Sequence, residues 1–190
     1  MNQTLIAFVE DKPGVLNRIT SLFRRRNFNI DSLVVGKTEK KNISRMTIVA
    51  NEKNSEKRKN IYFNLIKLIN VILVKDVSDI PCIEREYILV KVCINSENLN
   101  SFNELAKKYG ARIIDLSSNS AIIEASESKD RISILIDKLT PFNIVEIMRT
   151  GKMAMQKGLE PKNKEVHNIN GQQNLTDNLW ATKQLNSYLK

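Results

Sequence analysis

The residues best suited to chemistry in this chain are Pro13 and Gly14, which join an apolar run at residues 5–9 to a run with helical spacing at residues 15–23. A strand that turns directly into a helix leaves the first helical backbone amides without partners, and glycine has no Cβ to block what approaches them. The positive end of the helix dipole adds to these amides, so the turn can bind a carboxylate or a phosphate. A plain turn before a helix is the alternative interpretation of the same residues.

Alternating strand and helix patterns predict the elements that position this turn. Each half of the chain has the order strand, helix, strand, strand, helix, strand, and a breaker at residues 78–81 separates the halves. In the first half we expect strands at residues 4–10, 30–37, 43–50 and 71–77, with a turn at Asn42. We expect helices at residues 14–26 and from Ser55, which offers an N-cap. In the second half we expect strands at residues 87–94, 112–116, 120–125 and 144–148, and helices at residues 96–110 and 128–139. We therefore predict an α+β fold with two tandem ferredoxin-like βαββαβ modules.

The two modules are predicted to occupy residues 1–78 and 79–157, and a flexible tail is predicted at residues 158–190. Residues 87–94 are almost continuously apolar, which is typical of a strand buried on both faces. The tail is polar and poor in apolar residues. Leucines around Trp180 also fit a short amphipathic helix that docks on a partner, and a lineage-specific tail is the alternative.

Composition limits the classes of function. The 190 residues include 30 Lys and Arg against 21 Asp and Glu, a formal net charge of +9. This excess suits an anionic partner, but the basic residues are scattered through turns and the tail, so we interpret most of the charge as solvated surface. No apolar segment approaches the ~20 residues that span a bilayer, and we expect neither a membrane segment nor a leader peptide. Cys82 and Cys93 are expected to be buried thiols in a reducing compartment.

We expect no catalytic site in this chain. Its single histidine, His167, falls in the predicted tail, and no group of His, Cys, Asp or Glu has the spacing of a metal site. The basic charge raises nucleic-acid binding as an alternative, but ferredoxin-like RNA readers stack bases on aromatic residues of their central strands. Phe8 is the single aromatic residue in the corresponding strands here, so we expect no nucleic-acid partner.

Several spaced motifs resemble one known family. They are residues 11–18 (DKPGVLNR), 28–33 (FNIDSL), 44–48 (SRMTI), 68–71 (LINV), 84–86 (ERE) and 144–152 (IVEIMRTGK). In this order they resemble the regulatory small subunit of acetolactate synthase, also called acetohydroxyacid synthase, whose N-terminal module is an ACT domain. The likeness covers residues 1–157, and several motifs in one order are more specific than a single loop.

The resemblance implies a chain without catalytic activity that activates a separate large subunit and confers feedback inhibition by valine. Thiamine diphosphate, magnesium and FAD are then expected in the large subunit, and no cofactor is expected in this chain. The resemblance places the effector where the ACT domains of a homodimer pair. Gly14, Val15 and Leu16 would offer backbone amides to the carboxylate of valine. Asn29 and Ile30 would contact it from the neighbouring subunit.

Asp11 is also carried into the expected site, although bacterial members of the family often have asparagine there. An ionised aspartate only accepts hydrogen bonds, so it would favour the ammonium group of the effector and disfavour its carboxylate. The alternative is that Asp11 caps the following helix. An ACT-domain amino-acid sensor that serves another enzyme is the alternative function. Heavy use of Lys, Asn and Ile fits a plastid-encoded chain in the stroma or a bacterial chain in the cytoplasm.

Overall fold

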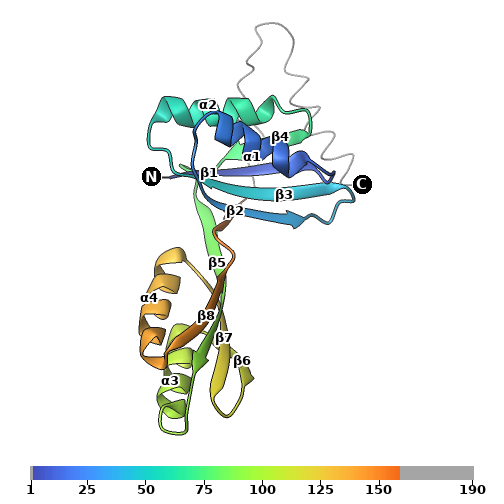
Figure 1. Cartoon of the computed structure of the whole chain (residues 1–190). Coiled ribbons are helices and arrows are strands. Elements are labelled where there is room, and N and C mark those ends of the chain that lie inside the picture. The colour runs from blue at the N-terminus through green and yellow to red at the C-terminus, as the bar shows by residue number, and fades with distance from the viewer. Residues whose placement is uncertain (1, 159–190) are drawn as a thin grey trace, which may run out of the picture. The chain divides into compact units, whose positions relative to one another are not determined.

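The computed structural model describes residues 2–158 (Figure 1). The described residues divide into two compact units, one formed by residues 2–82 with residues 156–158 and one formed by Ile83–Met155. The predicted tail, with Trp180 and His167, lies outside the described residues from residue 159 on. The two units are described separately.

The first unit is a four-stranded antiparallel sheet with two helices on one face (Figure 1). Its elements are β1 (Gln3–Glu10), α1 (Val15–Arg25), β2 (Ile30–Lys37), β3 (Ile43–Ala50), α2 (Ser55–Ile66) and β4 (Val71–Asp76). The strand order is β2-β3-β1-β4, so β2 and β4 are the sheet edges within the described residues. This is the ferredoxin-like order that the βαββαβ pattern predicted.

The core of the first unit lies between this sheet and its helices. Alternate residues of β1 enter it, and α1 contributes residues three and four positions apart, as an amphipathic helix must. The largest fully buried side chains from α1 are Ile19 and Phe23, and those from α2 are Ile61 and Leu65. Burial of one such side chain contributes ~1.5–3 kcal/mol to stability, and the packed helices thereby fix the turn between β1 and α1.

The second unit repeats this architecture. Its elements are β5 (Cys82–Cys93), α3 (Leu99–Tyr109), β6 (Arg112–Leu116), β7 (Ser120–Glu127), α4 (Lys129–Leu139), a 3-10 turn (Thr140–Phe142), β8 (Ile144–Arg149) and β9 (Met153–Gln156). The strand order is β6-β7-β5-β8, and β9 pairs with β5. Gly110 ends α3 with a φ of 66°, in the left-handed conformation expected at that place. The α+β fold with two ferredoxin-like modules is therefore confirmed.

Three sequence expectations about local structure are wrong. Strand β5 is not buried on both faces, because Ile88, Val90 and Val92 are buried while the residues between them are only half-buried. Asn54 rather than Ser55 caps α2, and its side chain accepts hydrogen bonds from the amides of the first turn. Helix α3 begins at Leu99, three residues later than expected, because residues 95–98 form a turn of their own through side-chain hydrogen bonds.

Strand β9 has no counterpart in the sequence expectations. It returns beside the first residues of β5, and the amide of Lys157 donates to the carbonyl oxygen of Pro81 at 2.9 Å. The chain therefore crosses between the two units twice, after Cys82 and before Gln156. Among the described helices, none is long and apolar enough to cross a bilayer.

Candidate functional site

The turn between β1 and α1 has the backbone that the ligand interpretation requires. Gly14 occupies the N-cap position of α1 with a φ of 84°, in the left-handed region that glycine adopts without strain. A Cβ built on Gly14 would meet no atom within 4 Å. The space in front of Gly14 is therefore open, and the conformation rather than crowding explains why glycine stands there.

Two backbone amides at the start of α1 are left open. The amide of Val15 donates to the carbonyl oxygen of Lys12 at 3.3 Å, and the carbonyl oxygen of Gly14 accepts from the amide of Arg18 at 3.0 Å. Within the described part of the chain, the amides of Leu16 and Asn17 have no recorded acceptor, and neither does the amide of Gly14 just before the helix. Of the three amides that the resemblance assigned to the effector, those of Gly14 and Leu16 are therefore open and that of Val15 is engaged.

Hydrogen bonds attach this turn to the loop before β4. The side-chain amide of Asn70 donates to Glu10 at 2.6 Å, and the guanidinium of Arg18 donates to the side-chain oxygen of Asn70. The hydrogen bonds from Asn70 and then from Lys12 lower the pKa of Glu10 from its ordinary value, so Glu10 stays ionised at neutral pH. The sequence analysis did not assign these roles to Arg18 and Asn70, although both lie in motifs that carry the family resemblance.

Asp11 does not cap α1. Its backbone amide donates to the carbonyl oxygen of Asn42 at 2.8 Å, and its carboxylate lies 3.7 Å from the ammonium of Lys37 at the end of β2. No side-chain cap closes the start of α1. The capping alternative is therefore wrong, and Asp11 instead lies beside the turn with a cation next to it.

Asn29 and Ile30 lie at the other end of the same sheet. Ile30 pairs with Ala50, which pairs with Gln3 at the start of β1, whereas the turn follows the end of β1. Seven residues of strand separate these ends by about 23 Å. The side chain of Asn29 is exposed and donates to Asp31 at 3.0 Å. One copy of the chain therefore brings together Asp11, Gly14, Val15 and Leu16, and leaves Asn29 and Ile30 far from them.

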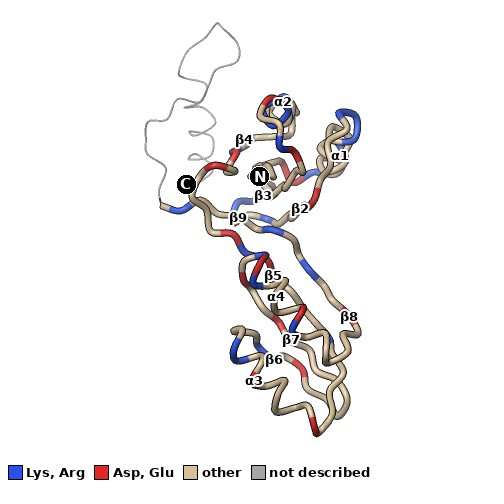
Figure 2. The backbone as a smooth tube through the Cα atoms, turned by 90° about the vertical axis from the view of Figure 1, so that its left-hand side faces the viewer, with Lys and Arg blue, Asp and Glu red and all other residues tan. Residues whose placement is uncertain are grey.

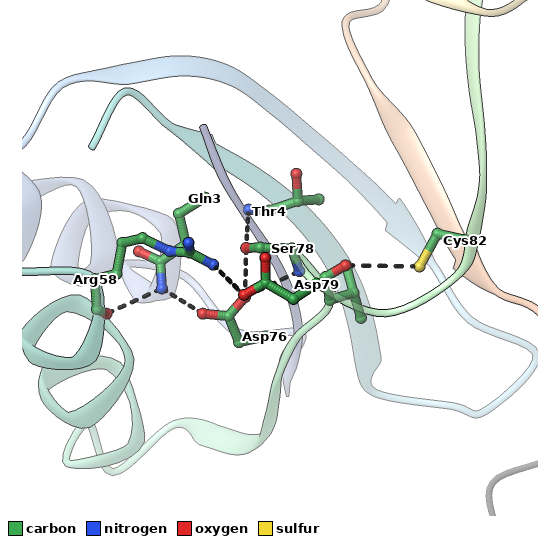
Figure 3. Close-up of polar contacts among 8 residues, drawn as sticks. Gln3, Thr4, Arg58, Asp76, Ser78, Asp79 and Cys82 are labelled. Atoms are coloured by element: carbon green, nitrogen blue, oxygen red, sulfur yellow. Dashed lines mark hydrogen bonds and ion pairs between the residues drawn. The ribbon is translucent and has the colours of Figure 1, made fainter. Parts of the chain in front are cut away.

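A second polar cluster in the first unit is structural in character (Figure 3). The side-chain amide of Gln3, which is fully buried, donates to the carbonyl oxygen of Arg58 at 2.9 Å and to Asp76 at 2.6 Å. Arg58 reaches Asp79 at 3.0 Å, and the amide of Thr4 donates to the hydroxyl of Ser78 at 2.9 Å. These bonds fasten α2 and the end of β4 to the start of β1. Sequence reasoning gave no role to this cluster.

Comparison with known proteins identifies the family. The family model described as "AHAS small subunit-like ACT domain" matches residues 5–73, and "Small subunit of acetolactate synthase" matches residues 85–158. The chain belongs to the acetolactate synthase small-subunit family. The resemblance seen in the sequence motifs is thus confirmed.

Named relatives and a solved structure agree with this membership. A probable acetolactate synthase small subunit of Archaeoglobus fulgidus is 42% identical over 158 residues, which cover 83% of this chain and 98% of that protein. The acetolactate synthase small subunit of Mycolicibacterium smegmatis is 40% identical over 155 residues, which cover 82% of this chain and 91% of that protein. The crystal structure of the small subunit from Thermotoga maritima matches with a TM-score of 0.79 at 31% identity, covering 84% of this chain and 99% of that one.

Proposed function

We propose that this chain is the regulatory partner of a catalytic acetolactate synthase large subunit, which it activates and makes sensitive to inhibition by valine. Membership of the small-subunit family supports the partnership. In this proposal the large subunit supplies the catalytic residues together with thiamine diphosphate, magnesium and FAD. The small subunit supplies a site for a free amino acid and a means of changing the geometry of the complex.

The observation that carries the effector site is the position of the turn beside the edge strand β2. Lys37 at the end of β2 contacts Asp11, while Ile30 begins β2 at its far end. If β2 of a second copy pairs antiparallel with this edge, its start lies beside the end of the first β2. Asn29 of the partner subunit and Ile30 of the partner subunit would then lie beside the turn. A homodimer thus assembles the two halves that one copy keeps apart.

The resulting site suits a small apolar amino acid. The open amides of Leu16 and Asn17 and the helix dipole favour its carboxylate. The carboxylate of Asp11 and the side-chain oxygen supplied by the partner's Asn29 favour its ammonium group. The side chain of Leu16 is 45% exposed and offers apolar contact to a short branched side chain.

Valine bound between the paired β2 edges can change the activity of the enzyme only by binding one arrangement of the two small subunits more tightly than another. Groups from both copies contact it in this proposal, so a change in how the β2 edges pair changes its affinity. Binding of valine in turn favours the pairing geometry that holds it more tightly. Inhibition follows because, in this proposal, that geometry is the less active one.

The experiment is reconstitution of the purified chain with the acetolactate synthase large subunit of the same organism. We expect added small subunit to raise the rate of acetolactate formation and valine to reduce that rate. Calorimetry with valine, leucine and isoleucine would rank the effectors. If the chain leaves the activity of the large subunit unchanged but binds another amino acid, it is instead an amino-acid sensor that serves a different enzyme.

A further inference from the structure

The net charge of this protein is concentrated in one unit rather than scattered. Residues 1–82 hold 15 Lys and Arg against eight Asp and Glu, whereas residues 83–155, which form the second unit, hold 10 against 10. The two units have the same fold and similar size, so the fold itself does not require this asymmetry.

A group of exposed cations from two helices lies at one end of the first unit. Ile30 pairs with Ala50, so the end of α1, just before Ile30, and the start of α2, just after Ala50, lie at the same end of the sheet. Figure 2 shows Lys and Arg on both helices. The exposed cations there form what we call the cationic end: Arg24, Arg25, Arg26, Lys53, Lys57 and Lys59.

Five acidic residues lie at this end, namely Asp31, Glu52, Glu56, Asp76 and Asp79. Asp76 and Asp79 pair with Arg58, which is not part of the cationic end. Glu52 lies 3.7 Å from Lys57, and Glu56 is the single acidic residue in the first turn of α2. Within the described residues, no ion pair is recorded for Arg24, Arg25 or Arg26.

The helix dipoles account for only part of this arrangement. Cations in the last turn of α1 are favourable to its dipole, and Arg24 and Arg25 lie there. Lysines at the start of α2 face the positive pole of that helix, and they also repel the arginines. The position of the lysines at this pole and their repulsion of the arginines both oppose folding of the free chain, so binding of an anionic partner would relieve both.

We propose that the cationic end docks on an acidic face of the catalytic large subunit. This inference depends on the proposed partnership but not on the valine site. A protein partner fits better than RNA, because β1 and β3 together contain Phe8 as their single aromatic residue and offer no platform for stacked bases. Opposite charges at such a surface raise the association rate, and the attraction between them weakens as the salt concentration rises.

The second unit offers a matched control for the test. Lys107 and Lys108 occupy the last turn of α3, as Arg24 and Arg25 occupy the last turn of α1. Reversing either pair to glutamate makes the same change in net charge and places two acids at the same unfavourable pole of a helix. The double variants R24E/R25E and K107E/K108E therefore differ mainly in which surface loses its charge.

The measurement is the concentration of small subunit that half-activates the large subunit, at ~50 and ~200 mM salt. We expect R24E/R25E to raise it about tenfold at the lower salt and to flatten its salt dependence, while K107E/K108E stays near wild type. K53E/K59E, which reverses the α2 side of the cationic end, should act in the same direction. Circular dichroism and thermal melts establish that each variant is folded.

The outcomes separate the proposals. A wild-type chain that does not activate the large subunit would contradict the proposed function itself. If wild type activates and R24E/R25E activates at the same concentration, or if K107E/K108E loses as much, the docking assignment is wrong. Binding of a labelled oligouridylate that R24E/R25E abolishes, with activation intact, would assign the cationic end to nucleic acid and overturn the inference.

Discussion

Glu86 and Arg149 form a bidentate ion pair between β5 and β8 in the second unit. The guanidinium donates to both carboxylate oxygens, at 2.9 and 2.8 Å, and the side chain of Glu86 is only 8% exposed. A second ion pair joins Lys152 to Glu84 at 2.9 Å. Glu84 lies two residues before Glu86 in β5, and its side chain is more exposed than that of Glu86. The sequence analysis names residues 84–86 and 144–152 only as separate motifs, and the structure joins them through these two ion pairs.

We expect Glu86→Gln to lower the free energy of unfolding by about 2 kcal/mol, because charge-assisted hydrogen bonds are lost at a buried position. Glu84→Gln is the matched control and should cost only ~0–1 kcal/mol, as exposed ion pairs do. Urea denaturation followed by circular dichroism measures both. Equal losses in the two variants would contradict the importance of burial here.

The hydroxyl of Tyr87 donates to the carboxylate of Glu124 at 2.6 Å on the other side of β5. This bond, and then Arg112, lower the pKa of Glu124 below its ordinary value of 4.5. A lowered pKa means that the ionised form stabilises the fold above about pH 4.5 and that this contribution is lost as the pH falls through the folded-state pKa.

We therefore expect the stability difference between wild type and Tyr87→Phe to be constant from neutral pH to about pH 5 and to shrink in more acidic solution. Urea midpoints measured across this range test it. Tyr62→Phe is the control, because burial rather than a hydrogen bond to a carboxylate is the first cause of the raised pKa of Tyr62. Its stability difference from wild type should therefore not follow the titration of Glu124. A Tyr87→Phe difference that does not change below pH 4.5 would show that ionised Glu124 is not the acceptor that matters.

Gly14→Asp should abolish inhibition by valine while the large subunit is still activated. The new carboxylate would occupy the space in front of the open amides and repel that of the effector. Gly14→Asn is the control, because asparagine has nearly the same shape, tolerates a positive φ equally and carries no charge. Inhibition curves for the three proteins give the result. Full valine sensitivity in Gly14→Asp would remove the turn from the effector site.

Val35→Lys should disrupt the homodimer. Val35 is 45% exposed on the edge strand β2, and a lysine on an edge strand opposes pairing with a second strand. Val145→Lys makes the same change on the edge strand β8 of the second unit, where the residue is 59% exposed. Sedimentation at several concentrations should give a monomer for the first variant and an unchanged dimer for the second. A dimeric Val35→Lys protein would exclude pairing through β2.

The fold was predictable because its elements are set by local pattern. Strands at residues 30–37 and 43–50 have the predicted bounds, since alternation and the turn at Asn42 define them without help from distant residues. The α2 cap was misassigned by one position because Asn54 and Ser55 are both good caps, and only the backbone conformation decides between them. Strand β9 was missed because four residues exist as a strand only through pairing with β5.

The candidate site was predictable only in part. The sequence indicated the turn and Gly14, because proline and glycine before a helix have a direct backbone meaning. It did not indicate that the Val15 amide is engaged, or that Lys37 reaches Asp11 across the fold. It also did not indicate that residues 24–26 and 53–59, which are separated in sequence, lie at the same end of one sheet.

The return of residues 156–158 to the first unit decides how this protein can be shortened. A stop codon after Cys82 removes the segment whose Lys157 amide bonds Pro81, so the truncated product loses part of its own unit. Excision of residues 83–155 with a short replacement linker keeps both flanks. The second unit is thus bracketed in sequence by two segments of its neighbour, so we expect an internal excision to preserve that neighbour better than a C-terminal deletion does.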